Sequence, residues 1–110
     1  MPIEASYIYV VRMDIDPEKE LEFNEVYDNE HIPIILKVPG VLSASRFKCG
    51  SNEEQQYLAI YELTDPSIPE TQEFITAAES GSWPTRIRPF TKNRSRVVYR
   101  KVYSNMVTND

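Results

Sequence analysis

The sequence is poor in three residue types on which many functional sites depend: cysteine, histidine and glycine. It contains one cysteine, one histidine and 3 glycines among 110 residues. The lone Cys49 excludes an internal disulfide framework and a cysteine-based metal cluster. A single histidine among scattered carboxylates lacks the clustered spacing of a metal site, and no phosphate-binding glycine loop, nucleophile elbow or nucleotide fingerprint occurs. We therefore expect neither a metal nor a nucleotide cofactor.

Long hydrophobic runs are also absent. None approaches the roughly 18–20 apolar residues of a membrane span, and the start MPIEASY has no basic stretch followed by an apolar one. We therefore expect a cytoplasmic protein with no membrane partner. The length and the 41% hydrophobic content predict a single domain over residues 1–104, followed by a flexible C-terminal tail over 105–110.

Charge is unevenly distributed along this acidic chain, whose net charge is −5. Residues 1–79 hold 16 of the 17 acidic residues, whereas residues 80–109 hold 7 of the 12 basic residues and no acidic one. Such a block can mark an anion site or a nucleic-acid site. We favour the simpler interpretation, in which the basic end lies near acidic elements and offsets them, because the overall charge opposes phosphate binding. No nucleic-acid partner is expected.

Runs rich in β-branched and aromatic residues predict four strands. These lie at 5–15, 41–49, 56–63 and 95–103. The polar segment 50–55 between the second and third strands predicts a hairpin loop.

Two helical segments separate these strands. Asp16-Pro17-Glu18 predicts the start of the first, with Asp16 capping its free N–H groups. Pro33 predicts a kink, or a short second helical piece over 33–38. The second helix is expected over about 69–80, with Gly81 as its C-cap. The proline-containing segment 82–93 then predicts a long irregular connection.

The resulting order, β-α-β-β-α-β, predicts a ferredoxin-like α+β fold: a four-stranded antiparallel sheet with both helices on one face. A sheet covered on one face should alternate apolar and polar residues. The first strand instead has Tyr7 and Tyr9 on one face and Ile8 and Val10 on the other. Because one helical layer covers only one face, we predict a homodimer that packs sheet against sheet.

The helix around the only histidine resembles that of a known family. Its motif, Tyr27-Asp28-Asn29-Glu30-His31-Ile32-Pro33, is followed by the turn Val38-Pro39-Gly40-Val41. Both are similar to the EthD-like group of the dimeric α+β barrel superfamily, and the third-strand run 57–63 is similar as well. The similarity spans roughly residues 5–103.

This resemblance implies a fold and a range of functions. The fold is a ferredoxin-like unit that dimerises into an α+β barrel, with a cleft between sheet and helices that the helix histidine faces. Relatives in the superfamily include cofactor-free cyclases and lyases, muconolactone-type isomerases, quinone-forming monooxygenases, and haem-binding or haem-degrading proteins. EthD-like proteins themselves are tied to the degradation of ethers and aromatic compounds.

His31 is the main candidate catalytic residue. Its neighbours at i−4 and i+3 are Tyr27 and Ile34, which places it on the apolar stripe facing the sheet. In the functional interpretation, His31 and Tyr27 form an acid–base pair acting on a bound carbonyl or phenol. In the structural interpretation, His31 hydrogen-bonds a backbone group freed by Pro33. Spacing alone favours the second, and the resemblance shifts the balance slightly toward the first.

Candidate substrate-binding residues come from the strands and from the last connection. Tyr57 and Tyr61 offer apolar rings with polar tips, which suit a flat oxygenated ligand, although strand tyrosines also serve as core or interface residues. Arg46 could anchor a substrate carboxylate or pair with an acid such as Glu62. Trp83 could line the cleft mouth or pack over the second helix.

These features predict a small cofactor-independent enzyme of the lyase, cyclase, isomerase or oxygenase type. Its substrate would be a hydrophobic or aromatic carbonyl compound bound between sheet and helices. One alternative is a non-catalytic binding or accessory protein that uses the same cleft. The other is a haem protein with His31 as axial ligand, since such a site needs little more than one histidine and an apolar slot.

Overall fold

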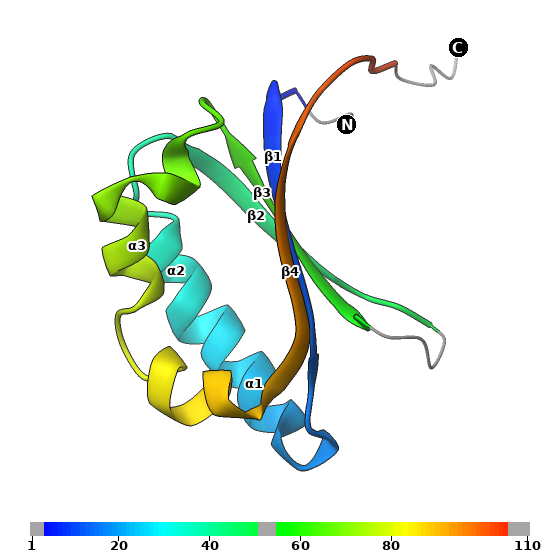
Figure 1. The fold of residues 1–110 in the computed structure, drawn as a ribbon, viewed down its shortest axis with the longest axis vertical. Helices are drawn as coiled ribbons and strands as arrows, with labels where there is room; N and C mark the ends of the chain where they lie inside the picture. The colour runs from blue at the N-terminus through cyan, green and yellow to red at the C-terminus, as the bar shows by residue number, and fades with distance from the viewer. Residues whose placement is uncertain (1–3, 51–54, 106–110) are drawn as a thin grey trace.

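A twisted sheet forms one layer of the computed structural model, and helices cover one of its faces (Figure 1). The structure describes residues 4–50 and 55–105. Its strands are β1 (Tyr7–Ile15), β2 (Val41–Lys48), β3 (Tyr57–Leu63) and β4 (Thr91–Arg100). They are paired antiparallel in the order β2-β3-β1-β4. This arrangement confirms the predicted ferredoxin-like α+β fold.

The first helical segment is nearly continuous but contains a wider turn. It consists of η1 (Pro17–Lys19), α1 (Glu20–Val26), the π-helical turn η2 (Tyr27–His31) and α2 (Ile32–Ile35). The break predicted near Pro33 therefore falls one turn earlier, where the Ile32 N–H donates to the Tyr27 carbonyl. Turns of this type are frequent at functional sites. The Asp16 side chain makes no capping hydrogen bond, so that predicted contact is wrong.

The second helical segment begins with η3 (Ile68–Glu70) and continues as α3 (Gln72–Ala78). Thr71 caps α3, because its Oγ1 accepts a hydrogen bond of 3.3 Å from the Phe74 N–H. Gly81 is not the C-cap that we expected, since Glu79 occupies that position. Gly81 adopts a φ of +71°, and its missing side chain leaves room for the carboxylate of Glu30.

The connection over 82–93 is helical at its centre, contrary to the predicted irregular structure. It forms the π-helical turn η4 (Trp83–Ile87) and the short helix η5 (Arg88–Phe90), and β4 begins at Thr91. Pro84 and Pro89 lie in the first turns of these helices. Proline is tolerated there because the N–H that it lacks would have no helical partner.

The two faces of the sheet differ in how they are covered. Tyr9, Met13, Tyr61 and Leu63 point toward the helices and are buried in the core. The opposite face carries apolar side chains that no element of residues 4–50 and 55–105 covers (Figure 1). Its exposed members are Phe47, Val97 and Tyr99, which pair with Leu58, Val10 and Ile8 in the sheet. The sheet-to-sheet homodimer stays a prediction. The domain boundary and the C-terminal tail also stay predictions, because residues 106–110 lie outside the described range.

Candidate functional site

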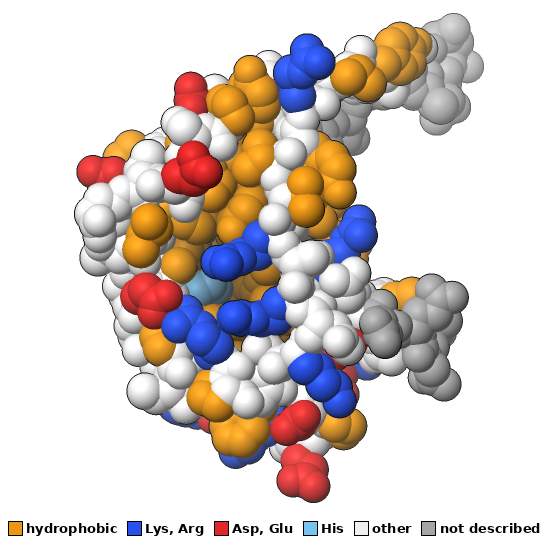
Figure 2. Space-filling view, in the orientation of Figure 1, with side chains coloured by type: hydrophobic (Ala, Val, Ile, Leu, Met, Phe, Trp, Pro, Cys, Tyr) orange, Lys and Arg blue, Asp and Glu red, His pale blue; other side chains and the backbone are white. Residues whose placement is uncertain are grey.

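A cleft opens between the covered face of the sheet and the helical layer. Its cavity volume is about 70 Å³. Aromatic and aliphatic side chains form its interior, and three arginines, Arg88, Arg94 and Arg96, lie among its lining residues. Figure 2 shows the histidine at the bottom of this hollow, with basic side chains around the opening. Of the sequence-predicted site residues, the cleft brings together His31, Tyr27, Tyr61 and Trp83.

His31 is held by its neighbours' rings rather than by hydrogen bonds. Its imidazole stacks on the Trp83 indole, with ring centroids 4.3 Å apart and planes inclined by 22°. The Tyr27 ring packs edge-on against the imidazole, with ring centroids 5.4 Å apart. His31 is 8% exposed, and its Nδ1 is buried with no hydrogen-bond partner in the described part of the chain. The structural interpretation of His31 therefore lacks the backbone hydrogen bond on which it depends.

Burial controls the charge of His31. Burial, with a smaller contribution from the positive charge of Arg88, lowers the pKa of His31 from 6.5 to about 4. Glu30 and Glu79 act in the opposite direction, and their effect is smaller. The imidazole is consequently neutral at pH 7, with a proton on one ring nitrogen and a lone pair on the other that can accept a proton.

The tyrosines of the cleft remain protonated. Burial raises the pKa of Tyr27, and it raises that of Tyr61 well above the usual value of 10.0. Their hydroxyl groups interact with each other, which raises the pKa of Tyr61 further and partly offsets the rise for Tyr27. Tyr27 thus meets His31 through its ring and Tyr61 through its hydroxyl, which differs from the direct His31–Tyr27 proton pair that we envisaged.

Trp83 forms a wall of the cleft. Its indole packs on His31 and also lies 4.9 Å from the Tyr27 ring and 6.1 Å from the Phe23 ring. Glu30 fixes the chain just before it, because the Ser82 N–H and hydroxyl both donate to the Glu30 carboxylate, the hydroxyl at 2.7 Å. This tie between η2 and the start of η4 sets the stacking of Trp83 on His31.

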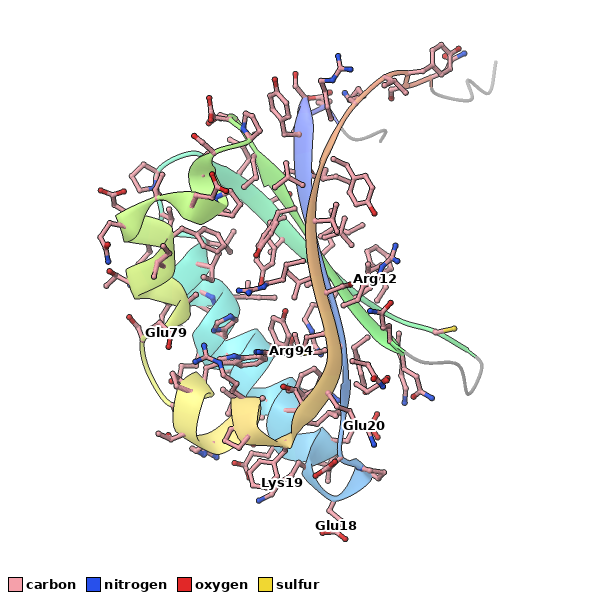
Figure 3. All side chains as sticks on the ribbon, viewed as in Figure 1. Arg12, Glu18, Lys19, Glu20, Glu79 and Arg94 are labelled. Carbon is pink, nitrogen blue, oxygen red and sulfur yellow. The ribbon has the colours of Figure 1, made fainter. Side chains whose placement is uncertain are left out.

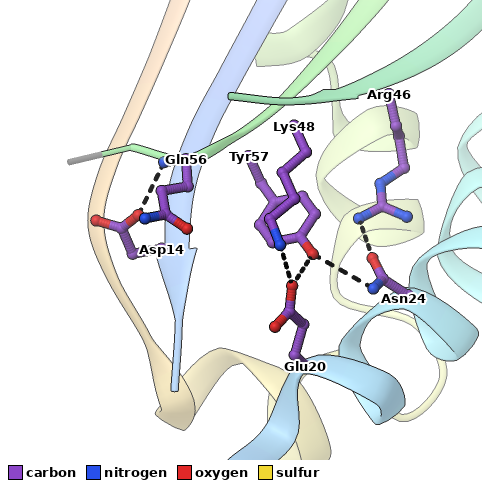
Figure 4. A network of polar contacts seen from close by, with 7 residues as sticks. All are labelled: Asp14, Glu20, Asn24, Arg46, Lys48, Gln56 and Tyr57. Carbon is purple, nitrogen blue, oxygen red and sulfur yellow. Dashed lines mark hydrogen bonds and ion pairs between the residues drawn. The ribbon is translucent and has the colours of Figure 1, made fainter. Parts of the chain in front are cut away.

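Arg46 and Tyr57 lie outside this cleft, in a polar network beside it (Figure 4). Arg46 donates to Asp28 at 2.6 Å and to Asn24 at 2.8 Å, and its guanidinium lies 4.3 Å from the centre of the Tyr27 ring. Arg46 thus pairs with an acidic residue, as one of the two alternatives expected, but that residue is Asp28 rather than Glu62, which accepts from the Ser43 hydroxyl.

Tyr57 has polar partners of its own in the same region. Its hydroxyl donates to Glu20 and accepts a 3.4 Å hydrogen bond from Asn24. Lys48 also pairs with Glu20, at 2.7 Å. We call the six residues Glu20, Asn24, Asp28, Arg46, Lys48 and Tyr57 the β2-edge network, since β2 is an edge strand. Their polar groups bind one another, which leaves little for a ligand.

The arginines of the cleft do not stand out in the sequence. Arg94 and Arg96 are two residues apart on β4, so both point to the covered face of the sheet. Arg12 on β1 points away from that face (Figure 3). The available signal was the basic block over residues 80–109. Its assignment as a general offset to acidic elements hid the fact that three of its members gather at one opening.

A four-stranded antiparallel sheet with helices on one face and a cleft between the layers defines a ferredoxin-like α+β protein with room for a small molecule. No family model matches the chain, and comparison with curated proteins finds no relative. Solved structures do match it. An EthD family protein from Bacillus halodurans has a TM-score of 0.63 at 15% identity, over 87% of this chain and 99% of that one.

Two other similar structures have assigned activities. SnoaB, a cofactor-independent oxygenase from Streptomyces nogalater, has a TM-score of 0.64 at 16% identity, over 90% of this chain and 96% of that one. The haem degrader MhuD from Mycobacterium tuberculosis, with two haems in its active site, has a TM-score of 0.61 at 14% identity, over 88% and 96%. These likenesses show a shared fold, and they support the EthD-like resemblance at that level.

Two further observations concern the described residues alone. In the ranges 4–50 and 55–105, no three His, Cys, Asp or Glu side chains gather where they could hold a metal ion. Within the same ranges, no helix has the length and apolar character needed to cross a membrane.

Proposed function

We propose that the protein is a cofactor-independent enzyme in which His31 removes a proton from an aromatic carbonyl or phenolic compound. One observation carries this proposal: His31 lines an aromatic cleft as a neutral imidazole, and its buried Nδ1 has no hydrogen-bond partner among the residues that the structure describes. A buried nitrogen with no hydrogen bond costs free energy unless a ligand completes it. In the tautomer with its proton on Nε2, Nδ1 has a free lone pair, and a bound acidic C–H or O–H group would complete it.

The other cleft residues have roles that follow from their protonation. Removing a proton next to a carbonyl, or from a phenol, puts negative charge on the substrate oxygen. Protonated Tyr27 and Tyr61 supply hydroxyl groups that can donate to this oxygen. Trp83 offers a flat apolar surface to a substrate ring. The fold shared with a cofactor-independent oxygenase supports this chemistry as a precedent.

The test uses 1,8-dihydroxyanthrone, a phenolic ketone with an acidic CH₂ group. Once deprotonated, an anthrone reacts with dioxygen to give the anthraquinone and water, a balance that requires no cofactor. We expect the wild-type protein to accelerate quinone formation, followed by absorbance. His31→Gln should lower the rate by a factor on the order of 10²–10⁴.

The control for this test is Tyr57→Phe, which lies in the β2-edge network and should retain most of the activity. Circular dichroism would establish that both variants are folded. Unchanged turnover in His31→Gln would contradict the proposal. Binding of the anthrone without any turnover would instead favour the accessory binding protein.

Haem is the second candidate, and the unpartnered Nδ1 of His31 is the observation that favours it. The space does not fit this group. The iron of a haem lies at the centre of a wide, rigid macrocycle, so much of that ring would have to enter a cavity of about 70 Å³ to reach His31, whereas a smaller aromatic molecule can enter by one edge. We therefore do not propose haem as a ligand of this cleft. A Soret band that requires His31 in a haem titration would overturn this conclusion.

We also propose a homodimer formed through the uncovered face of the sheet. Phe47 and Tyr99 are 53% and 45% exposed there, and an apolar face of this kind usually marks an interface. Sedimentation at micromolar concentration should give a dimer, and Val97→Asp should give a folded monomer. A wild-type monomer with an intact fold would contradict this proposal.

A further inference from the structure

The mouth of the cleft carries more positive charge than its neighbourhood neutralises. Arg88, Arg94 and Arg96 all line it, from η5 and β4. Arg88 forms a two-pronged pair with Glu79, with both contacts at 2.9 Å. Arg94 and Arg96 form no ion pair with any residue of the described ranges. One carboxylate therefore faces three guanidinium groups.

Two electrostatic observations place these arginines together at the opening. The pKa of Glu79 is lowered by its hydrogen bonds to Arg88 and, further, by the positive charges of Arg88, Arg94 and Arg96. Burial raises the pKa of Tyr9, and interaction with Arg96 partly offsets that rise. Arg96 thus lies against a cleft tyrosine, and Arg94 lies on the helical side of the sheet (Figure 3).

The size of the cleft determines where a ligand would meet this charge. A volume of about 70 Å³ encloses only part of an aromatic molecule. Any substituent on the outer part of a bound ring therefore lies at the mouth, beside Arg94 and Arg96. Figure 2 shows the corresponding arrangement, with the histidine deep in the hollow and basic side chains at its edge.

We propose that the ligands of this cleft are aromatic carboxylates, with the ring packed against Tyr61 and Trp83 and the carboxylate held by Arg94 and Arg96. Guanidinium groups bind carboxylates through charge-assisted, often two-pronged hydrogen bonds. This inference rests on the proposed function, because it assigns a substrate class to the same cleft. It concerns binding only, so it can be tested without turnover.

The experiment compares two probes that share one ring system: 2-naphthoate, which is an anion, and 2-naphthamide, which is neutral. Isothermal titration calorimetry gives both dissociation constants. Quenching of Trp83, the only tryptophan, reports whether the probe enters the cleft. Wild-type protein should bind naphthoate about tenfold tighter than naphthamide, and added salt should reduce this preference because the arginines are exposed.

The double variant Arg94→Gln, Arg96→Gln should bind both probes equally while its affinity for naphthamide stays unchanged. Arg100→Gln is the matched control, since Arg100 lies on the same strand but lines a separate hollow. It should keep the full preference. A preference that survives in the double variant, or wild-type protein that binds naphthoate no better than naphthamide or not at all, would overturn the inference.

His31→Gln separates this inference from the proposed function. Its anion preference should equal that of the wild type even though its turnover is lost. Loss of the preference with His31 alone would show that the arginines are not the anion site. Retained preference together with unchanged turnover would refute the catalytic role and leave the carboxylate site standing.

Discussion

The cleft and the β2-edge network lie side by side and share the ring of Tyr27, yet they differ in how completely their polar groups are paired. In the network, Arg46 binds Asp28 and Asn24, and Glu20 accepts from both Tyr57 and Lys48. In the cleft, His31 Nδ1 has no partner within the described residues. Arg94 and Arg96 likewise have no ion pair there.

This difference distinguishes groups that stabilise the fold from groups that remain available to a ligand. Leaving a buried polar atom unpaired lowers stability, so a site that persists with such an atom is better explained by binding than by folding. Charged and aromatic residues of the same types occur in both regions. Their residue types alone therefore do not identify the site, whereas their pairing does.

The largest expected difference between the two regions is the effect of a substitution on the catalytic rate. His31→Gln should reduce anthrone turnover by roughly 10²–10⁴-fold, the usual contribution of general base catalysis. Arg46→Met should change the rate by no more than a few-fold, since its guanidinium is occupied by Asp28 and Asn24. Equal losses of activity in the two variants would remove the functional distinction between the regions.

A second prediction concerns the pH dependence of stability. The pKa of His31 is about 4 in the folded protein and 6.5 when unperturbed, so the unfolded chain takes up the proton first as the pH falls. The contribution of neutral His31 to the free energy of unfolding is therefore complete above about pH 6.5, and it is lost progressively as the pH falls toward 4. A shift of this size corresponds to ~3 kcal/mol in the free energy of unfolding.

Urea denaturation between pH 7.5 and 4 measures this loss. The carboxylates titrate in the same range, so the informative quantity is the difference between wild-type protein and His31→Gln. That difference should change with pH by the amount given above. A difference that stays constant from pH 7.5 to 4 would show that His31 is not kept neutral by the fold.

Within the β2-edge network, Arg46→Met should reduce stability without affecting the cleft. The Arg46 side chain is 13% exposed in the wild type. The variant lacks its two charged hydrogen bonds and its guanidinium over the Tyr27 ring. We expect a decrease of about 1–3 kcal/mol in the free energy of unfolding. The dissociation constant of 2-naphthoate should not change, and a weakening of more than threefold would place Arg46 in the binding site.

The smallest effect is expected for Lys48→Met. Lys48 pairs with Glu20 while half exposed, and such surface pairs contribute little. The urea midpoint should therefore stay within experimental error of the wild type. A clear decrease would indicate that the network acts as a cooperative unit, which would strengthen its contrast with the cleft.

The fold could be predicted because its order of strands and helices is encoded in local patterns. Segment 82–93 was the exception, since Pro84 and Pro89 indicate breaks in a linear pattern but begin helical turns in the structure. The role of Gly81 was also hidden. Gly81 has a positive φ, and the Glu30 carboxylate lies where a side chain at Gly81 would be. Because Glu30 is far away in the sequence, local pattern does not indicate this contact.

The candidate site was predictable only where one helix face or one strand face decided it. His31 and Tyr27 share a helix face, and Tyr61 lies opposite them on β3. Tyr57 has the same strand face as Tyr61 but lies at the other end of β3, where it joins the network. Arg94 and Arg96 were missed because their place beside His31 depends on the order of strands in the sheet, with β4 at the edge that borders the cleft.

An NMR titration of the His31 ring tests most directly whether His31 is a buried, neutral base. Because the chain contains one histidine, a single pair of ring signals reports its protonation without assignment by mutagenesis. These signals should titrate with a pKa of about 4 in the free protein, and binding of 2-naphthoate should shift them. Titration near the ordinary value of 6.5 would contradict a buried, neutral base with an unpartnered nitrogen.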